Sequence, residues 1–147
     1  FVLASQDWHP LNHISFQEQG GPWPPHCVQK SKGADFHPDL DQSKISLIQR
    51  KGYLPEREQY SAFDQTGLAE MLKCRGVKRL YITGVATDYC VKMSTLGALE
   101  GGLETTVILD AIKGVEVKPG DVEKALEKMR QAGAKFAYSS EVLAELS

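Results

Sequence analysis

An aspartate and two histidines near the start of the chain have the types and spacing of metal ligands. Asp7 and His9 are two residues apart, and side chains at that spacing point the same way from an extended backbone, so a carboxylate and an imidazole can meet one ion. His26 offers a third ligand, because Pro24 and Pro25 hold the backbone before it extended. This set leaves coordination positions open, as catalytic metal sites do. An isolated Asp-x-His pair is also compatible with polar residues of a surface loop.

The other histidines and the identity of the ion are less determined. His13 is a candidate for a further ligand or for a group that orients one, whereas His37 reads as an ordinary surface histidine. Zinc, iron and manganese all accept two histidines and an aspartate. The pattern therefore predicts a divalent metal ion as cofactor, with zinc the first choice.

A cysteine at the start of a helix is the candidate nucleophile. In Gly84-Val-Ala-Thr-Asp-Tyr-Cys90 a buried strand ends in glycine, the chain turns, and Cys90 stands in the first turn of a helix. The unpaired N–H groups and the positive end of the helix dipole favour a thiolate, and the same N–H groups can bind the oxyanion formed when a carbonyl is attacked. Alternatively, Cys90 only packs, as free cysteines often do. Cys27 and Cys74 fit that packing role better.

One lysine and two aromatic residues are further candidates. Lys51 follows a short apolar strand, and its ammonium could lower the pKa of the thiol and stabilise developing negative charge, although most lysines in such places are simply solvated. Trp23 and Tyr60 lie in loops that flank the candidate site, where they could sandwich a flat ring. Taken alone, each is equally compatible with packing.

The elements that must position these residues alternate between strand and helix. Strands are expected at residues 1–5, 44–49, 79–84, 104–109 and 135–138, and helices at residues 65–74, 86–100, 121–132 and the C-terminal end. Asp64 is expected to cap the first of these helices. The alternation predicts an α/β domain with three layers and a mainly parallel central sheet. Asp7, Lys51 and Cys90 each follow a strand, so we expect them on one rim, at the carboxyl ends where such sheets bind ligands.

Composition limits the class of protein. The 147 residues, 41% of them hydrophobic, suit a single domain with an apolar core over residues 1–147. A formal net charge of −2 and the absence of any long apolar run argue against nucleic acid and membrane as partners. Three cysteines without metal-type pairing suit free thiols in a reducing compartment, and no signal peptide is visible. A cytoplasmic location is therefore expected.

Four motifs, in order along the chain, carry a family resemblance. They are Asp7-Trp-His9-Pro, Trp23-Pro-Pro-His26, Arg50-Lys51-Gly and Gly84-Val-Ala-Thr-Asp-Tyr-Cys90-Val. Together they resemble the nicotinamidase, or pyrazinamidase-like, branch of the isochorismatase-like cysteine hydrolase superfamily, whose fold is a Rossmann-like α/β/α sandwich. The resemblance implies hydrolysis of nicotinamide to nicotinate and ammonia, through attack of the cysteine on the carboxamide and a thioester intermediate.

The resemblance also implies roles for single residues in the reaction. Cys90 would be the nucleophile and Lys51 the cationic member of its catalytic triad. The backbone amides of Ala86 and Cys90 would form the oxyanion hole, beside a cis peptide bond between Val85 and Ala86. A non-proline cis bond costs about 3 kcal/mol, so it would mark a functional turn.

In the same way the resemblance implies how substrate and metal are held. Asp7, His9 and His26 would be the metal ligands, and the ion would hold the pyridine nitrogen and ordered waters. Trp23 and Tyr60 would form walls of the pyridine pocket. Activity on pyrazinamide-like analogues is left open, and so is the oligomeric state, because the family includes monomers and larger homo-oligomers.

One member of the family's triad has no counterpart in this sequence. The family places an aspartate general base after a strand that precedes everything seen here, and neither Asp35 nor Asp39 stands in that context. We therefore expect an N-terminal strand and helix that are absent from this chain, and an unstable, inactive fragment without them. The alternatives are another isochorismatase-like amidohydrolase that lacks the metal, or a catalytically dead fragment or binding module.

Overall fold

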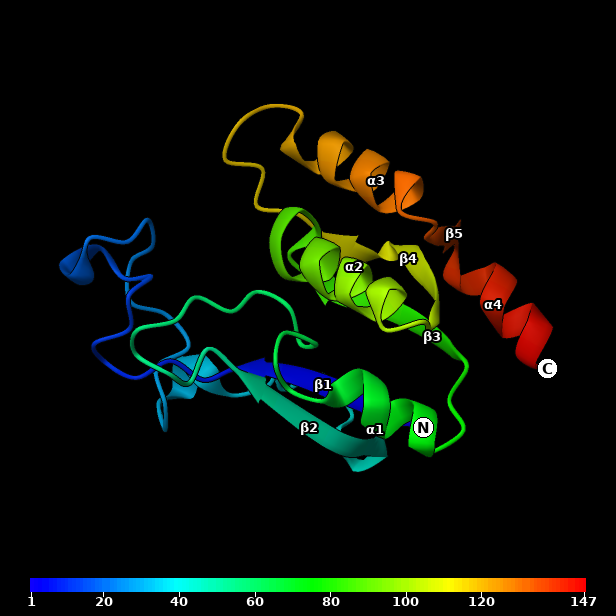
Figure 1. Ribbon diagram of the computed structural model, residues 1–147, viewed down its shortest axis with the longest axis horizontal. Coiled ribbons are helices and arrows are strands. Elements are labelled where there is room, and N and C mark those ends of the chain that lie inside the picture. The colour runs from blue at the N-terminus through cyan, green and yellow to red at the C-terminus, as the bar shows by residue number, and fades with distance from the viewer. The chain divides into compact units, whose positions relative to one another are not determined.

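The chain combines parallel sheets with helices. The computed structural model describes residues 1–147, apart from the side chain of residue 146. The chain divides into two compact units, residues 1–62 and residues 63–147. In both units neighbouring strands pair in parallel. The predicted α/β class with parallel strands is therefore confirmed, with the strands divided between two sheets (Figure 1).

Residues 1–62 contain a two-stranded sheet and a long irregular segment. Strands β1 (Val2–Asp7) and β2 (Ile45–Lys51) pair side by side (Figure 1). In their register Asp7 lies opposite Lys51. Both strands end two residues later than the sequence pattern predicts. Asp7 and Lys51 are therefore the last residues of their strands and do not follow them. The segment between the strands contains three short 3-10 helices, η1 (Gln17–Gln19), η2 (Lys32–Ala34) and η3 (Gln42–Lys44).

Residues 63–147 form a second sheet with its helices. The strands β3 (Arg79–Val85), β4 (Glu104–Lys113) and β5 (Lys135–Ala137) pair in the order β3-β4-β5. The helices are α1 (Leu68–Cys74), the π-helical turn η4 (Thr87–Val91), α2 (Lys92–Glu100), α3 (Asp121–Gln131) and α4 (Ser139–Leu146). Helix α2 contacts β4 and α3, and α4 contacts β4 (Figure 1).

The core of this second unit is built around the β-branched run of β4. Val107 has no exposed surface and packs in one cluster with Val91, Met129 and Ala134. Helix α3 contributes Met129 from its apolar face, while acidic residues stand in its first turn and basic residues in its last, which complements the helix dipole. The turn that precedes α2 is thus anchored in the core through Val91.

The start of α1 differs from the sequence prediction. The helix begins at Leu68 after Gly67, and Asp64 does not cap it. The reason is local, because Gln65 and Gly67 have φ angles of 54° and 68°, in the left-handed region that cannot continue a right-handed helix. The helix predicted over residues 86–100 is likewise divided, into the π-helical turn η4 and α2.

Among the residues whose placement is described, no helix combines the length and the apolar character that crossing a bilayer requires.

Candidate functional site

Three residues of the first unit form a group that could hold a metal ion. One ligand atom from each of Asp7, His9 and His26 lies within 4.8 Å of the other two. Asp7 ends β1 and His9 follows it, buried, two positions on. His26 reaches them because the backbone N–H of His9 donates to the carbonyl of Cys27 at 2.9 Å, and His9 forms an isolated parallel bridge with Val28. The segment that carries His26 is thus tied to the end of β1.

Hydrogen bonds fix both imidazoles in the tautomer that a metal site needs. Nδ1 of His9 lies 2.8 Å from the carbonyl oxygen of Gly52, and Nδ1 of His26 lies 2.8 Å from that of Pro24. Because a carbonyl can only accept, each Nδ1 carries the hydrogen and each Nε2 keeps its lone pair. Nε2 of His9 is 3.8 Å from Oδ2 of Asp7, which is too long for a hydrogen bond. The donor set therefore fits a divalent cation, with backbone carbonyls orienting both rings.

Electrostatics at this group keep Asp7 in its ionised form. Burial alone would raise the pKa of Asp7, but its interactions with His9 and Lys51 outweigh this and hold the pKa well below its usual range. Burial would lower the pKa of His9, but Asp7 and the carbonyl of Gly52 outweigh this and raise it. Asp7 is thus ionised at neutral pH and surrounded by groups that compensate its charge.

Lys51 belongs to the same group. It is 3% exposed, and its Nζ donates a hydrogen bond to Oδ1 of Asp7 and lies 3.5 Å from the carbonyl oxygen of Gln59. A buried ammonium needs such partners. The next residue, Gly52, donates its N–H to Oε1 of Gln59 at 2.8 Å while its carbonyl accepts from His9. Lys51 therefore contacts Asp7 while Gly52 contacts His9, and because the lysine is buried, the alternative of a solvated Lys51 does not hold.

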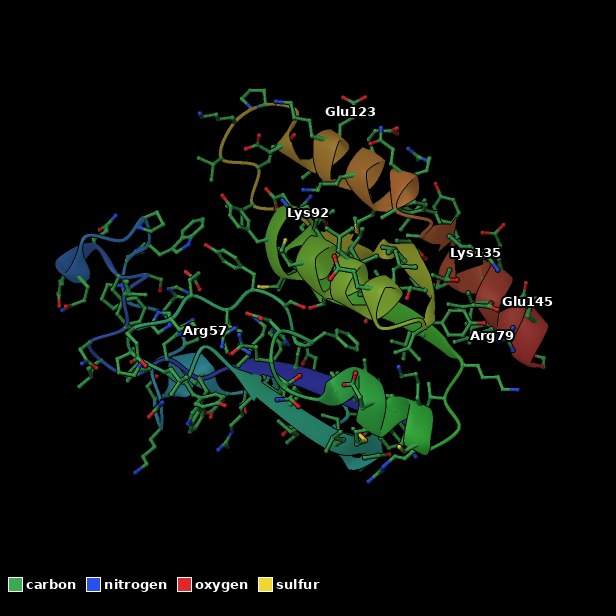
Figure 2. The ribbon with its side chains drawn as sticks, viewed as in Figure 1. Arg57, Arg79, Lys92, Glu123, Lys135 and Glu145 are labelled. Atoms are coloured by element: carbon green, nitrogen blue, oxygen red, sulfur yellow. The ribbon has the colours of Figure 1, made fainter. Side chains whose placement is uncertain are left out.

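His13 packs beside the metal group with both of its ring nitrogens engaged. It has no exposed surface, and its ring lies 4.2 Å from that of His9, centroid to centroid. Nδ1 is 2.7 Å from Oγ of Ser15, and Nε2 is 3.0 Å from the carbonyl oxygen of Arg57, a residue labelled in Figure 2. Burial, aided by His9, lowers the pKa of His13. This geometry favours the orienting role over that of a further ligand.

The remaining candidates of the first unit fall into two groups. Trp23 and Tyr60 are both half-buried and are joined by a hydrogen bond of 3.0 Å from Nε1 of the indole to the phenol oxygen. His37 is a surface histidine, as predicted, with a side chain that is 75% exposed. The structure thus brings the two aromatic candidates together.

In the second unit, Cys90 lies on the π-helical turn η4, between β3 and α2. The turn follows a cis peptide bond between Val85 and Ala86, which the family resemblance predicts. The carbonyl of Ala86 accepts the N–H groups of Tyr89 and Val91, each at 3.0 Å. Cys90 is half-buried, and the turn that carries it is anchored in the core through Val91. π-helical turns of this kind occur frequently at functional sites.

The packing role predicted for Cys74 is wrong. Cys74 is exposed, because it is the last residue of α1 and lies off the face that buries Leu68, Ala69 and Leu72. Cys27 is half-buried and adopts a positive φ of 47°.

Sequence reasoning missed two residues that support the candidates. The side chain of Gln59 accepts a hydrogen bond from the N–H of Gly52. The side chain of Asp88 accepts hydrogen bonds from the backbone that follows β4. Asp88 could have been found as a buried acidic residue within the cysteine motif, whereas Gln59 carries no signal in the sequence. The structure thus assembles two groups, Asp7, His9, His26 and Lys51 in one unit, and Ala86 and Cys90 in the other. The expectation that both share one rim stays a prediction.

Comparison with known proteins places the chain in a family. The model of the isochorismatase domain matches residues 1–141. The chain belongs to the isochorismatase family. It is 41% identical to a nicotinamidase of Escherichia coli K12 over 154 residues, which cover 90% of this chain and 72% of that protein.

Solved structures of this family resemble the chain over nearly its whole length. A pyrazinamidase of Pyrococcus horikoshii in complex with zinc matches with a TM-score of 0.85 and 49% identity, covering 94% of this chain and 75% of the other. PnC1 of L. infantum in complex with nicotinate matches with a TM-score of 0.89 and 38% identity, covering 94% and 71%. The isochorismatase-like fold is thereby confirmed.

Proposed function

We propose that this isochorismatase-family protein hydrolyses nicotinamide to nicotinate and ammonia, with Cys90 as nucleophile and a divalent metal ion, zinc first, held by Asp7, His9 and His26. The observation that carries the proposal is the group of three ligands whose two imidazoles both keep Nε2 available. Relatives named nicotinamidase, one structure in complex with zinc and another with nicotinate support it. Residues 1–147 would belong to one hydrolase domain.

The proposed chemistry is acyl transfer through sulfur. The thiolate of Cys90 attacks the carboxamide carbon, a carbon–sulfur bond forms, and the electron pair of the carbonyl moves to oxygen. The amides of Ala86 and Cys90 are proposed to bind this oxyanion. When the carbonyl re-forms, the carbon–nitrogen bond breaks and the nitrogen leaves as ammonia, taking up the proton that the thiol gave up on becoming a thiolate. Water then attacks the thioester, which releases nicotinate and restores the thiol.

The other residues are proposed to activate the thiol and hold the ring. Lys51 is the cation that favours thiolate over thiol. Trp23 and Tyr60 would form the walls of the pyridine pocket, and their hydrogen bond would fix the two rings relative to each other. The ion, when bound, supplies an attachment point for the pyridine nitrogen and for ordered water. The reaction would supply nicotinate for NAD salvage in the cytoplasm, where free thiols stay reduced.

A coupled assay for ammonia release from nicotinamide tests the proposal. Cys90→Ala should lower kcat by at least about 10³-fold with the fold intact, because the nucleophile is lost. Cys74→Ala is the matched control, since its exposed thiol should leave kcat unchanged. Wild-type activity in Cys90→Ala would overturn the mechanism.

Metal dependence is tested separately. Asp7→Ala and His9→Ala should purify without the bound metal that elemental analysis finds in the wild type. Chelation should abolish turnover, and re-addition of zinc, iron or manganese one at a time would identify the effective ion. Unchanged metal content in both variants would move the ligands elsewhere.

A further inference from the structure

A buried carboxylate joins the turn that carries Cys90 to the segment that follows β4. Asp88 is 4% exposed. Its Oδ1 accepts the backbone N–H of Val115 at 2.9 Å, and its Oδ2 accepts that of Glu116 at 2.8 Å. Both oxygens of one side chain are thus used to hold a segment 27 and 28 residues further along the chain. Such charge-assisted bonds are stronger than bonds between neutral groups.

The segment beyond β4 is shaped to fit this carboxylate. A Cβ at Gly114 would lie 3.2 Å from Oδ1 of Asp88 and would collide with Val122, so a side chain has no room there. Glu116 has a φ of 54°, in the left-handed region, and its own carboxylate accepts the N–H of Gly120 at 3.1 Å. The backbone at residues 114–116 therefore lies close against the carboxylate of Asp88.

The two segments that Asp88 joins lie at the same end of one sheet. β3 and β4 are parallel neighbours, η4 follows β3, and residues 114–116 follow β4. In parallel sheets ligands bind at the carboxyl ends of the strands. The carboxylate therefore braces this end of the sheet beside the candidate nucleophile.

Asp88 is unsuited to act as a general base. Burial raises its pKa, but the amides of Val115 and Glu116 outweigh this and lower it, so the carboxylate is a weak base with both oxygens occupied. Nor can its charge activate the cysteine, because a neighbouring anion disfavours a thiolate. The remaining role for Asp88 is to hold the two backbone segments in position.

We propose that Asp88 is a positioning residue, which fixes the η4 turn against residues 114–116 and so holds Cys90 at the start of the helix in its reactive orientation. This inference rests on the proposed function, in which Cys90 is the nucleophile. Lys92, labelled in Figure 2 at the start of α2, and Asp121 also act electrostatically on this turn. Lys92 and Asp121 are unchanged when Asp88 is replaced by asparagine, so the substitution removes a single negative charge from this turn.

The test compares Asp88→Asn with Asp110→Asn in the full chain. Asp110 is an exposed control matched in hydrogen bonding, because its two oxygens also accept two hydrogen bonds, from the N–H and hydroxyl of Ser139, and join β4 to α4. Asp88→Asn should lower kcat for nicotinamide by about 10- to 100-fold with KM changed less than about threefold, since small misplacements of reacting groups cost up to about 100-fold. Asp110→Asn should stay within about twofold of the wild type, as it lies outside the braced turn.

A second readout follows the thiol itself. Alkylation of Cys90 by iodoacetamide, resolved from Cys27 and Cys74 by peptide mass, is measured against pH. Loss of positioning should move the midpoint of this profile upward, because the thiol leaves the positive end of the helix. Loss of the negative charge of Asp88 alone would move it downward. An unchanged or lowered midpoint, or a kcat in Asp88→Asn within twofold of the wild type, overturns the proposal.

Two further comparisons keep the test decisive. If Asp88→Asn does not fold, Val115→Pro removes one of the two N–H donors at an exposed position and should give the same changes to a smaller degree. Unchanged kcat and alkylation in a folded Val115→Pro would then overturn the proposal. Failure of the proposed function appears in the wild type as absent ammonia release, whereas the alkylation profile still decides the role of Asp88.

Discussion

Replacing Gly52 by alanine tests whether the peptide after β2 holds the first histidine of the metal group. Gly52 has a φ of 64°, and a Cβ added there would lie 2.6 Å from Nδ1 of His9. No real Cβ contact is that short, so either the ring or the backbone must move. Movement of the ring breaks the hydrogen bond that fixes its tautomer. We therefore expect Gly52→Ala to weaken metal binding.

The magnitude follows from two separate costs. Placing an L-residue in the left-handed region costs about 1–2 kcal/mol. Overpacking against the buried His9 ring adds about 1–3 kcal/mol. The free energy of unfolding should thus fall by about 2–5 kcal/mol in total. Disturbing a group that orients a metal-bound histidine lowers metal affinity by about 10- to 100-fold.

Gly67→Ala is the matched control for backbone strain. Its φ of 68° nearly equals that of Gly52, yet a Cβ there would meet nothing within 4 Å. It should lose only the left-handed cost, about 1–2 kcal/mol, and keep its metal affinity. Urea unfolding measures stability in both variants, and competition with a chelator measures zinc affinity. If both variants lose the same stability and Gly52→Ala binds zinc like the wild type, the reasoning about His9 is refuted.

Three further predictions concern stability. Because folding lowers the pKa of Asp88, the wild type should be more stable than Asp88→Asn by a full margin above the ordinary carboxyl pKa of 3.8, and this margin should shrink as the pH falls below that value. Urea unfolding at pH 7 and pH 3 measures the difference in unfolding free energy between the two proteins, and a constant difference would contradict the prediction. Within the described part of the chain the buried Oγ1 of Thr95 has no hydrogen-bond partner, so Thr95→Val should raise the free energy of unfolding by about 1 kcal/mol, and a loss would speak against it. Met129→Ala should lower the free energy of unfolding by about 2–5 kcal/mol, because Met129 has no exposed surface. Val117→Ala, at a position 60% exposed, should change it by less than about 0.5 kcal/mol. Equal effects in thermal or urea unfolding would contradict the assignment of Met129 to the core.

The sequence predicts best what is local. The pairing of Asp7 with His9 depends only on the alternation of an extended chain, and the position of Cys90 depends on a strand, a glycine and a helix in succession. The order of strands and helices follows from the same short-range patterns, so the α/β class could be predicted. The start of α1 could not, because a left-handed Gln65 is unusual for a residue of that type.

What the sequence does not reveal is which distant groups meet. The ion pair between Lys51 and Asp7 depends on the register of two strands separated by a long irregular segment. The bonds of Asp88 to Val115 and Glu116 likewise span an entire helix and strand. Such contacts are set by tertiary packing, and no spacing rule connects their partners.

The parallel pairing of β1 with β2 makes the chemistry depend on alignment. Because successive side chains of a strand face opposite ways, slipping β2 by a single position would turn Lys51 away from Asp7 even if every backbone bond re-formed. One inserted or deleted amino acid within Ile45–Lys51 would therefore separate the side chain of Lys51 from Asp7 while leaving a well-formed sheet.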